Sequence, residues 1–253
     1  MATITLTDNQ WFKMVAFLRQ CSGVYVGNEA TCRLFVEAVL WITRSGSQWR
    51  LLPEQYGKWN SIYKRFAGWC ERGIWEQMLA YCANEPDLEC LLLDSTVIRA
   101  HPCAAGAPSE RGGQAEQALG RSRGGFSTKI HAVVDALGNP LDFVLTAGQT
   151  HDVTQGQTLL QGRRSEYVIA DKGYDANDFL AFIEAMGAIP VIPARKNRTE
   201  ARYYDPHIYK ERHLIECFFN KIKWYRRIFS RFDKLASRFL GFLSFVASLI
   251  WLR

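Results

Sequence analysis

Three carboxylates stand where a purely structural role explains them poorly. Asp94 interrupts the apolar run LLLDSTVI, Asp171 ends the apolar run YVIAD, and Glu216 lies in the amphipathic stretch YKERHLIECFFNKIK. An unpaired carboxylate inside an apolar strand costs on the order of several kcal/mol, so Asp94 needs a cationic partner or a metal ion. Carboxylate oxygens are hard ligands that suit Mg²⁺, for which Mn²⁺ can substitute. If the three carboxylates converge in the folded chain, the sequence predicts a site for divalent metal ions.

Each carboxylate also has an ordinary explanation. Asp94 can be structural, Asp171 can cap a helix or form a turn, and Glu216 can form a solvated i,i+4 ion pair with Arg212. Such a helical pair contributes only about 0.2–0.5 kcal/mol, and for this helix alone a solvated charged face is the better explanation. Taken together, the three carboxylates favour a metal site, in which two ions about 4 Å apart would serve phosphodiester chemistry.

The stretch from 209 to 223 predicts a helix with a polar stripe beside its apolar side. At about 100° per residue, the stripe spans about 60° and contains Tyr209, Arg212, Glu216 and Lys223, with Asn220 at its border. Arg212 and Lys223 would neutralise phosphates beside the metal site. Tyr209 would hydrogen-bond a phosphate or stack on a base. The apolar side is formed by Leu214, Ile215, Phe218, Phe219 and Ile222.

The first part of the chain, 1–86, predicts a small helical domain. Helices are expected over 7–20, 29–46 and 60–73. Thr7 or Asp8 is the expected cap of the first helix. Gly46 should end the second, and Asn60 should cap the third. The second and third helices resemble a helix-turn-helix in outline, although the loop between them is longer than the usual tight turn. A DNA-binding module is favoured over a plain packing domain, because the rest of the chain also points to DNA.

The remainder, 87–253, predicts a ribonuclease H-like domain, an α/β fold with a mixed sheet flanked by helices. Three strands come first, the last two forming a hairpin that turns at ALGNP, and strands and helices then alternate. A Gly/Ala-rich loop over 102–125 follows the first strand, and Thr150 is the expected cap of a short helix. The expected strands cover 88–101, the two arms of 126–148, 166–171 and 188–195, and the expected helices cover 150–164, 175–187, 209–223 and 235–252.

The charge distribution predicts a polyanionic partner. The net charge is +6 and the pI is about 9.0. Residues 195–253 hold fourteen Lys and Arg against five Asp and Glu, whereas 89–194 hold eight against twelve. A carboxylate-rich middle beside a basic end suggests a metal site facing nucleic acid, although a basic surface that serves solubility explains the charge alone equally well.

Several other residues are candidates for the site. His151 follows the hairpin and would approach the metal ions, but a helix-capping role for its neighbour Asp152 is at least as good an explanation of this segment. Trp224 would stack on a displaced base. The glycine-rich segment 120–129 would contact phosphates, or would be only a mobile connection; its cations are Arg121, Arg123 and Lys129.

The remaining features predict a cytoplasmic protein without a membrane span. The seven cysteines are scattered, with no C-x-x-C pair, and indicate reduced, mostly buried thiols. The N-terminus lacks the pattern of a secretory signal. The apolar run over 239–252 is too short to span a bilayer comfortably, so the final helix is expected to be core or a dimer contact.

With these motifs in view, the sequence resembles DDE transposases of the IS5 family, in the IS4/IS5 superfamily. The order Tyr209, Arg212, Glu216, Lys223 is similar to the Y-(2)-R-(3)-E-(6)-K signature of that superfamily. LLLDSTVIRAH and VIADKGYDA are similar to its other two acidic motifs, and residues 49–75 resemble its N-terminal region.

The resemblance implies a DNA transposase of a bacterial insertion sequence, with Asp94, Asp171 and Glu216 as the catalytic triad. It further implies that Tyr209, Arg212 and Lys223 contact DNA, that the partners are terminal inverted repeats and target DNA, and that the protein is a homodimer or higher oligomer on DNA. Only about twenty residues separate the last strand from the glutamate helix, where some relatives insert a β-rich domain, so a hairpin intermediate is not assumed. A structure-specific nuclease of the same fold and a domesticated, non-catalytic DNA-binding protein remain as alternatives.

Overall fold

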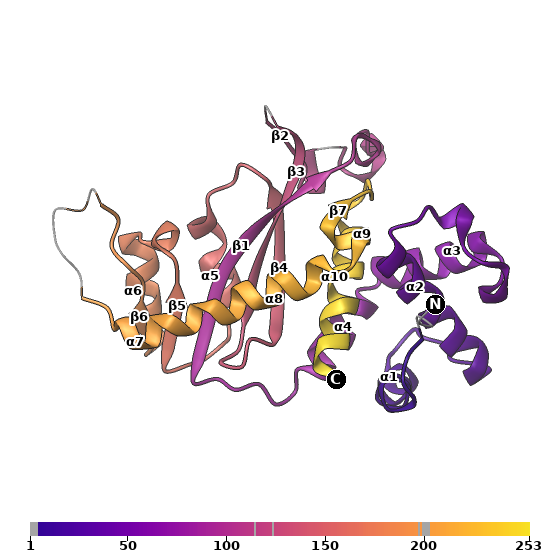
Figure 1. Ribbon diagram of the computed structural model, residues 1–253, viewed down its shortest axis with the longest axis horizontal. Coiled ribbons are helices and arrows are strands. Elements are labelled where there is room, and N and C mark those ends of the chain that lie inside the picture. The colour runs from indigo at the N-terminus through magenta and orange to yellow at the C-terminus, as the bar shows by residue number, and fades with distance from the viewer. Residues whose placement is uncertain (1–4, 114, 123, 197, 199–202) are drawn as a thin grey trace.

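The computed structural model describes residues 5–113, 115–122, 124–196, 198 and 203–253, so Arg123 lies outside the described residues. The N-terminal region is helical, as predicted (Figure 1). Its helices are α1 (Asp8–Gln20), α2 (Glu29–Ser45), α3 (Trp59–Glu71) and α4 (Ile74–Cys82).

Local capping explains where the first two helices begin and end. Thr7 forms a capping box with Gln10 at the start of α1, and Gly46, at φ 68°, ends α2 in the left-handed conformation that glycine adopts without strain. The prediction that Asn60 caps the third helix is wrong: α3 begins at Trp59, and Lys58 precedes it without a side-chain cap. The sequence patterns did not predict the fourth helix, α4, which begins directly after Gly73 without a side-chain cap.

The centre of the molecule is a seven-stranded sheet. Its path runs β2-β3-β1-β5-β6, with β4 beside β3 and β7 beside β1. β1, β3 and β4 are antiparallel neighbours, whereas β5 and β6 run parallel to β1. This is the ribonuclease H-like order that the sequence predicted. The strands are β1 (Cys90–Ala100), β2 (Gly120–Ser122), β3 (Gly125–Val134), β4 (Pro140–Ala147), β5 (Tyr167–Ala170), β6 (Ile189–Val191) and β7 (Ser230–Arg231).

Helices cover both faces of the sheet, because both faces of its central strands are apolar. On β1, Leu92 packs into the cluster that contains the helix of Glu216, whereas Leu91 and Leu93 pack on the opposite face against α5 and α6. Side chains alternate along a strand, so Asp94 shares the face of Leu92. The helices concerned are α5 (Gly156–Leu160), α6 (Asn177–Ala185), α7 (Pro206–Tyr209), α8 (His213–Lys223), α9 (Arg226–Phe229) and α10 (Ala236–Trp251).

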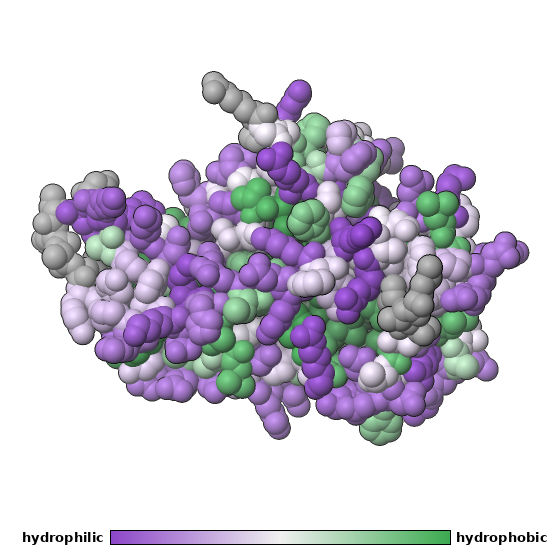
Figure 2. Space-filling view, viewed as in Figure 1, coloured by the Kyte–Doolittle hydropathy of each residue, from purple (hydrophilic) through white to green (hydrophobic). Residues whose placement is uncertain are grey.

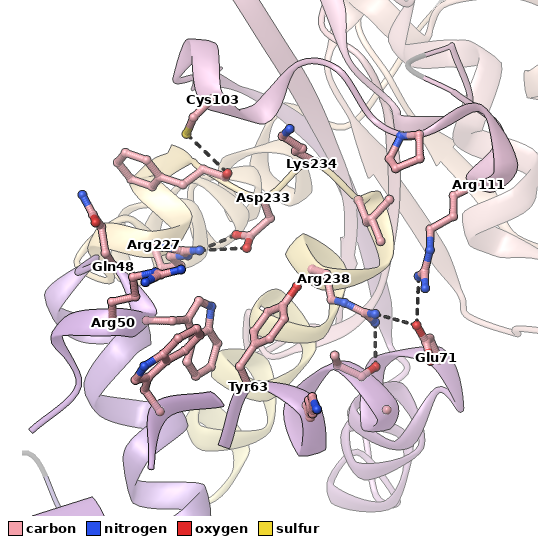
Figure 3. Close-up of a pocket in the computed structure, with 18 residues that line it drawn as sticks. Gln48, Arg50, Tyr63, Glu71, Cys103, Arg111, Arg227, Asp233, Lys234 and Arg238 are labelled. Atoms are coloured by element: carbon pink, nitrogen blue, oxygen red, sulfur yellow. Dashed lines mark hydrogen bonds and ion pairs between the residues drawn. The ribbon is translucent and has the colours of Figure 1, made fainter. Parts of the chain in front are cut away.

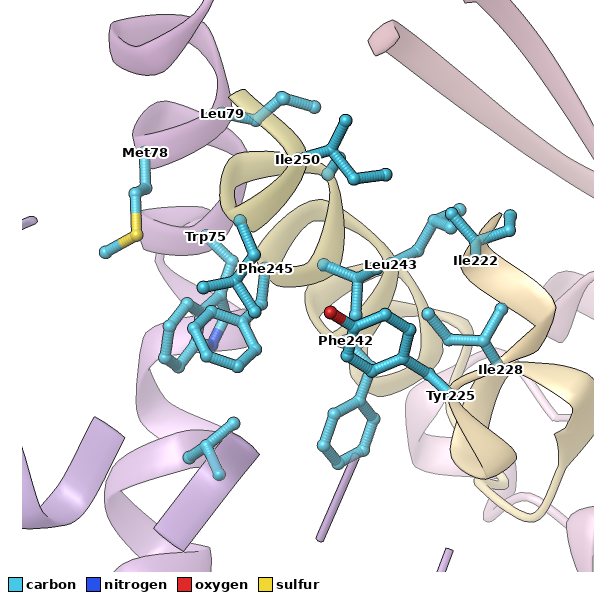
Figure 4. Packing of buried hydrophobic residues seen from close by; sticks show 14 of the residues in the cluster. Trp75, Met78, Leu79, Ile222, Tyr225, Ile228, Phe242, Leu243, Phe245 and Ile250 are labelled. Carbon is cyan, nitrogen blue, oxygen red and sulfur yellow. The ribbon is translucent and has the colours of Figure 1, made fainter. Parts of the chain in front are cut away.

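The final helix, α10, is a core element of this chain. Figure 4 shows it between α4 on one side and the α8–α9 segment on the other, with Phe245 near Trp75 and Leu243 near Ile222. The rings of Phe245 and Trp75 are 5.0 Å apart. The first and last parts of the sequence therefore share one hydrophobic core, and the domain division at residue 86 stays a prediction. Within the described parts of the chain, every helix is too short or too polar to cross a lipid bilayer.

Two local predictions about the middle of the chain are wrong. The segment 120–129 is not a mobile connection where it is described, because β2 and β3 pair there as a hairpin. The helical turn after β4 begins at Asp152, as a 3-10 helix, and Thr150 does not cap it.

All seven cysteines are free; only Cys103 and Cys217 are exposed. Between β6 and α7, the described residues contain no further strand.

A buried arginine, Arg231, ties β7 to the rest of the sheet. Its guanidinium donates to the Thr128 hydroxyl at 2.6 Å and to the Asp233 carbonyl at 2.9 Å, and burial lowers its pKa to about 10. We expect Arg231→Met to lower the free energy of unfolding by about 3 kcal/mol or more, because several buried acceptors lose their donor. Arg99→Met, an exposed cation on β1, should change it by less than about 0.5 kcal/mol in the same denaturant titration. Equal effects would contradict this role of Arg231.

Candidate active site

Two of the predicted carboxylates meet where two parallel strands end their pairing. The last paired residues of β1 and β5 are Leu93 and Ala170, and the next residues are Asp94 and Asp171. Beyond this point β1 continues with β3, whereas β5 ends and the chain turns into a 3-10 helix at Lys172. The gap that opens between the strands leaves room for a site at the carboxyl end of β5, where sites form in open α/β sheets.

The backbone holds both aspartates in place. Asp94 Oδ1 accepts the N–H of Ser95 at 2.7 Å, and Asp171 Oδ1 accepts the N–H of Gly173 at 2.7 Å. Asp171 therefore does cap the short helix that follows it, so its capping role and its place in the site are compatible.

The third carboxylate, Glu216, is joined to this edge through an arginine. Arg212 donates to Asp94 Oδ2 at 2.8 Å and also to Glu216 Oε1. The side chain of Asp94 is 16% exposed and that of Glu216 is 52% exposed. Asp94 faces the side of the sheet on which α8 packs, and Figure 1 shows α8 crossing in front of the sheet. Arg212, which directly precedes α8, can therefore reach both Asp94 and Glu216.

Burial dominates the electrostatics of Asp94. The pKa of Asp94 is raised to about 6, chiefly by desolvation and to a smaller extent by the neighbouring Asp171, while the Ser95 N–H and Arg212 act in the opposite direction. The positive charge of Arg212 thus compensates only part of the desolvation. A second positive charge at this edge would be stabilised, which is the property expected of a site that receives metal ions.

The other residues on and beside the predicted polar stripe differ in their exposure and in their contacts. Residues 210–212 form a 3-10 turn, in which positions i and i+3 eclipse, so Arg212 lies over the ring of Tyr209, 6.0 Å from its centroid. Burial raises the pKa of Tyr209, and Asp171 contributes to the rise. Lys223 is half-buried at the last position of α8, and Asn220 and Trp224 are exposed. The structure brings none of these three into contact with the carboxylates among the contacts described.

The three carboxylates predicted to hold metal ions do not all converge in this conformation. Among the described residues, no group of three or more His, Cys, Asp or Glu side chains is arranged to share one metal ion. The donor set still fits a hard divalent cation: two aspartate oxygens lie at one sheet edge, and a guanidinium already supplies positive charge between Asp94 and Glu216.

Sequence reasoning missed a set of cations beside Asp171. An open cavity of about 410 Å³ borders this residue, and exposed Lys172, Arg195 and Lys196 line it. Arg195 is held there by the carbonyls of Lys172 and Gly173 at 3.1 and 2.7 Å. The run ARKNR beside the motif DKGYD was the available signal, but only the fold shows that the two segments are neighbours. Figure 2 shows mainly hydrophilic side chains over this face of the molecule, with small separate apolar spots.

The other predicted candidates lie apart from the carboxylates or are already paired. His151 is exposed, and no described contact joins its ring to them. Arg121 is exposed on β2, over the ring of Phe126 at 5.7 Å. Lys129 lies in β3, not in a loop, and its ammonium group pairs with Asp152 Oδ1 at 2.7 Å. The Asp152 carboxylate accepts no backbone N–H in the described contacts, so the capping explanation for it is wrong.

A second cavity, of about 710 Å³, lies at the junction of α3 with the turn before α10. Figure 3 shows Arg238 and Arg111 converging there on Glu71, with Arg227 paired to Asp233. None of the three carboxylates lines it. Its ion pairs link the N-terminal helices to the last part of the chain, so it is a junction between the two regions, separate from the candidate active site.

Two family models match this chain. The model described as "Transposase DDE domain" matches residues 85–250, and the model described as "Putative transposase of IS4/5 family" matches residues 6–79.

The chain is also similar to curated relatives and, more distantly, to solved structures. A protein of Brucella ovis named "Putative transposase for insertion sequence element IS6501" is 45% identical over 130 residues, which is 51% of this chain and 100% of the relative. A protein of Burkholderia cepacia, named "Putative transposase for insertion sequence element IS402", is 32% identical over 135 residues, 49% of this chain and 62% of the relative. The piggyBac transposase synaptic complex with hairpin DNA aligns with a TM-score of 0.37 and 13% identity, covering 78% of this chain and 44% of that one. The order and directions of the strands identify the fold of this chain.

Proposed function

Because the chain belongs to the IS4/5 family of DDE transposases, we propose that it cuts DNA at the terminal inverted repeats of an insertion sequence and joins the freed ends to target DNA. The observation that carries this proposal is the meeting of Asp94 and Asp171 at one sheet edge, with Glu216 tied to it through Arg212.

Asp94, Asp171 and Glu216 would hold two divalent metal ions, Mg²⁺ or Mn²⁺. The ions, when bound, activate the attacking oxygen and stabilise the leaving oxygen of a phosphodiester. Asp94 and Asp171 are already fixed by backbone N–H groups, so Glu216, which is half-exposed on α8, is the ligand that adjusts. Its change of partner from Arg212 to metal would complete the site.

The cations around the carboxylates would bind the DNA backbone. Once released from Glu216, Arg212 can form two parallel hydrogen bonds with a phosphate, for which its planar guanidinium is suited. Tyr209 would orient that arginine through its ring or donate to the phosphate. Lys223 would contact the backbone further along α8, and Asn220, Trp224 and Arg121 are assigned to DNA as weaker candidates.

The chemistry consists of two displacements at phosphorus. In the first, water attacks the phosphodiester at the element end, and the bond to the 3′ oxygen breaks, leaving a 3′-hydroxyl on the element. In the second, that hydroxyl attacks a phosphodiester of target DNA; a new bond to phosphorus forms, and the target's own 3′ oxygen leaves. No covalent enzyme intermediate is needed, and the carboxylates would hold the metal ions that orient the reacting oxygens.

The N-terminal helices would recognise the terminal repeats. We place this activity in the cytoplasm, on a dimer or larger assembly that brings two element ends together. The ion pairs that Glu71 of α3 forms with Arg238 of α10 and with Arg111 support a fixed position of the N-terminal helices relative to the catalytic sheet.

A strand-transfer assay tests the proposal. Labelled DNA carrying the repeats that flank the gene is incubated with the full chain, a target plasmid and Mg²⁺, and both cleavage and joined products are measured. We expect both products for the natural sequence, and for Glu216→Gln a fall in each of about a hundredfold or more. Cleavage without joining would indicate a nuclease of the same fold, and repeat binding without either product would indicate a non-catalytic DNA-binding protein.

A further inference from the structure

A fourth carboxylate, Asp152, is held beside the three already described. Its Oδ1 accepts the Ser95 hydroxyl at 2.7 Å and the Lys129 ammonium at 2.7 Å, and the Lys129 ammonium also donates to the Thr150 carbonyl at 2.6 Å. The side chain of Asp152 is 24% exposed. Two donors on one oxygen fix the direction of the carboxylate and leave Oδ2 without a partner among the described contacts.

This carboxylate approaches the site from the opposite face of the sheet. Ser95 follows Asp94 on β1, so the two side chains point to opposite faces, and Lys129 shares the face of Val133 on β3. Arg212 and Glu216 therefore border the site from the α8 side, whereas Asp152 borders it from the α5 and α6 side.

The geometry at Gly173 shows where Oδ2 points. A Cβ built on Gly173 would lie 2.7 Å from Asp171 Oδ1 and 3.6 Å from Asp152 Oδ2. Oxygens of both carboxylates thus border the same small space, which stays open because residue 173 has no side chain. A side chain here would fill the space between the two oxygens.

A buried hydroxyl gives an independent sign that this space receives a ligand. Tyr174 is completely buried, and its hydroxyl has no hydrogen-bond partner among the described residues. The pKa of Tyr174 is raised well above its ordinary value by burial first, and then by Asp152, Asp94 and Asp171, so this residue lies within electrostatic range of the three carboxylates. An unsatisfied buried hydroxyl is costly, and a hydrated cation between the carboxylates would supply the missing partner.

We propose that Asp152 is a fourth metal-binding carboxylate, which shares one divalent cation with Asp171. Ser95 and Lys129 are its positioning residues, and the charge of Lys129 offsets the repulsion that a further carboxylate would add. Lys129 is consequently assigned to this network and not to a DNA phosphate. The inference rests on the proposed function, since it concerns the same metal centre.

Titration of the full chain with Mn²⁺, followed by electron paramagnetic resonance of the free ion, tests this assignment. We expect Asp152→Asn to weaken Mn²⁺ binding about tenfold or more, with little change in the melting temperature, because the amide oxygen still accepts from Ser95 and Lys129. Asp142→Asn is the matched control: this carboxylate lies on β4, is 55% exposed and pairs with Arg163, so its loss should leave the affinity unchanged.

The outcomes separate the inference from the proposed function. If Asp171→Asn loses Mn²⁺ affinity while Asp152→Asn keeps it, Asp152 is structural and the inference is overturned, with the proposed function intact. If the natural sequence binds no Mn²⁺, even with repeat DNA present, the proposed metal centre fails as a whole. Should Asp152→Asn unfold, Ser95→Ala provides the second test: it keeps the charge and removes one positioning donor, so an affinity loss of a few-fold supports the assignment and an unchanged affinity contradicts it.

Discussion

Asp94→Asn should abolish DNA cleavage and joining while making the metal-free protein more stable at pH 8. The loss of activity is expected to be about a thousandfold or more, since a ligand that supports several kcal/mol of transition-state stabilisation is removed. The gain in stability follows from burial, because the carboxylate is desolvated and its cationic partner among the described residues, Arg212, is shared with Glu216.

The direction of the pH dependence follows from the raised pKa of Asp94. In the folded chain this carboxyl holds its proton up to about pH 6, whereas its ordinary pKa is 3.8. The folded state therefore binds more protons between these values, and the contribution of Asp94 to stability improves as the pH falls from about 6 to 3.8. Above pH 6 the full cost of the buried charge is present. With 1.36 kcal/mol for each pKa unit, Asp94→Asn should stabilise the fold by about 1–3 kcal/mol at pH 8 and hardly at all near pH 4.

Denaturant titrations in the presence of a chelator, at pH 8 and at pH 4, measure this difference. Asp142→Asn serves as the control, because an exposed carboxylate on the same sheet should show no comparable gain. A variant at position 94 that is less stable than the natural sequence at pH 8 would show that the ion pair with Arg212 outweighs the desolvation of Asp94. The assignment of this residue as a functional carboxylate kept at the expense of stability would then be wrong.

Arg212→Gln should tighten metal binding and impair catalysis at the same time. In the structure the guanidinium lies 2.8 Å from Asp94 Oδ2 and also bonds Glu216, so it would compete with a divalent cation for two of the three proposed ligands. Without DNA, removing this charge should raise Mn²⁺ affinity at least several-fold, since one positive charge no longer repels the ion at close range. With DNA, cleavage should fall about a hundredfold, because the phosphate loses its bidentate donor.

Lys210→Gln provides the matched comparison for both measurements. Lys210 is an exposed cation in the same short 3-10 turn, and its loss lowers the net charge by the same amount. If Arg212→Gln and Lys210→Gln change Mn²⁺ affinity equally, the effect is one of overall charge. If Arg212→Gln weakens metal binding, the arginine supports the carboxylates and does not compete for them.

Much of the fold could be predicted from local patterns. The apolar run around Asp94 and the alternation after it gave the order of three antiparallel strands followed by parallel ones, and the capping signal at Thr7 and the glycine at 46 gave helix ends. The predictions at Asn60 and Thr150 failed because a polar residue near a helix start is not sufficient: in both places the chain enters its helix without any side-chain cap.

Sequence patterns were enough to identify the available chemical groups and the kind of element on which each one lies: two aspartates at strand positions, and a glutamate and an arginine four residues apart on one helix. Which of these groups meet depends on the folded chain. Arg212 reaches Asp94 across 118 positions of sequence, Asp152 turns from an expected helix cap into a neighbour of Asp171, and Arg195 comes to the edge of the site. The physical reason is that periodicity fixes the face on which a side chain lies, whereas its partners depend on strand register and on the crossing of α8 over β1, which are set by packing between distant segments.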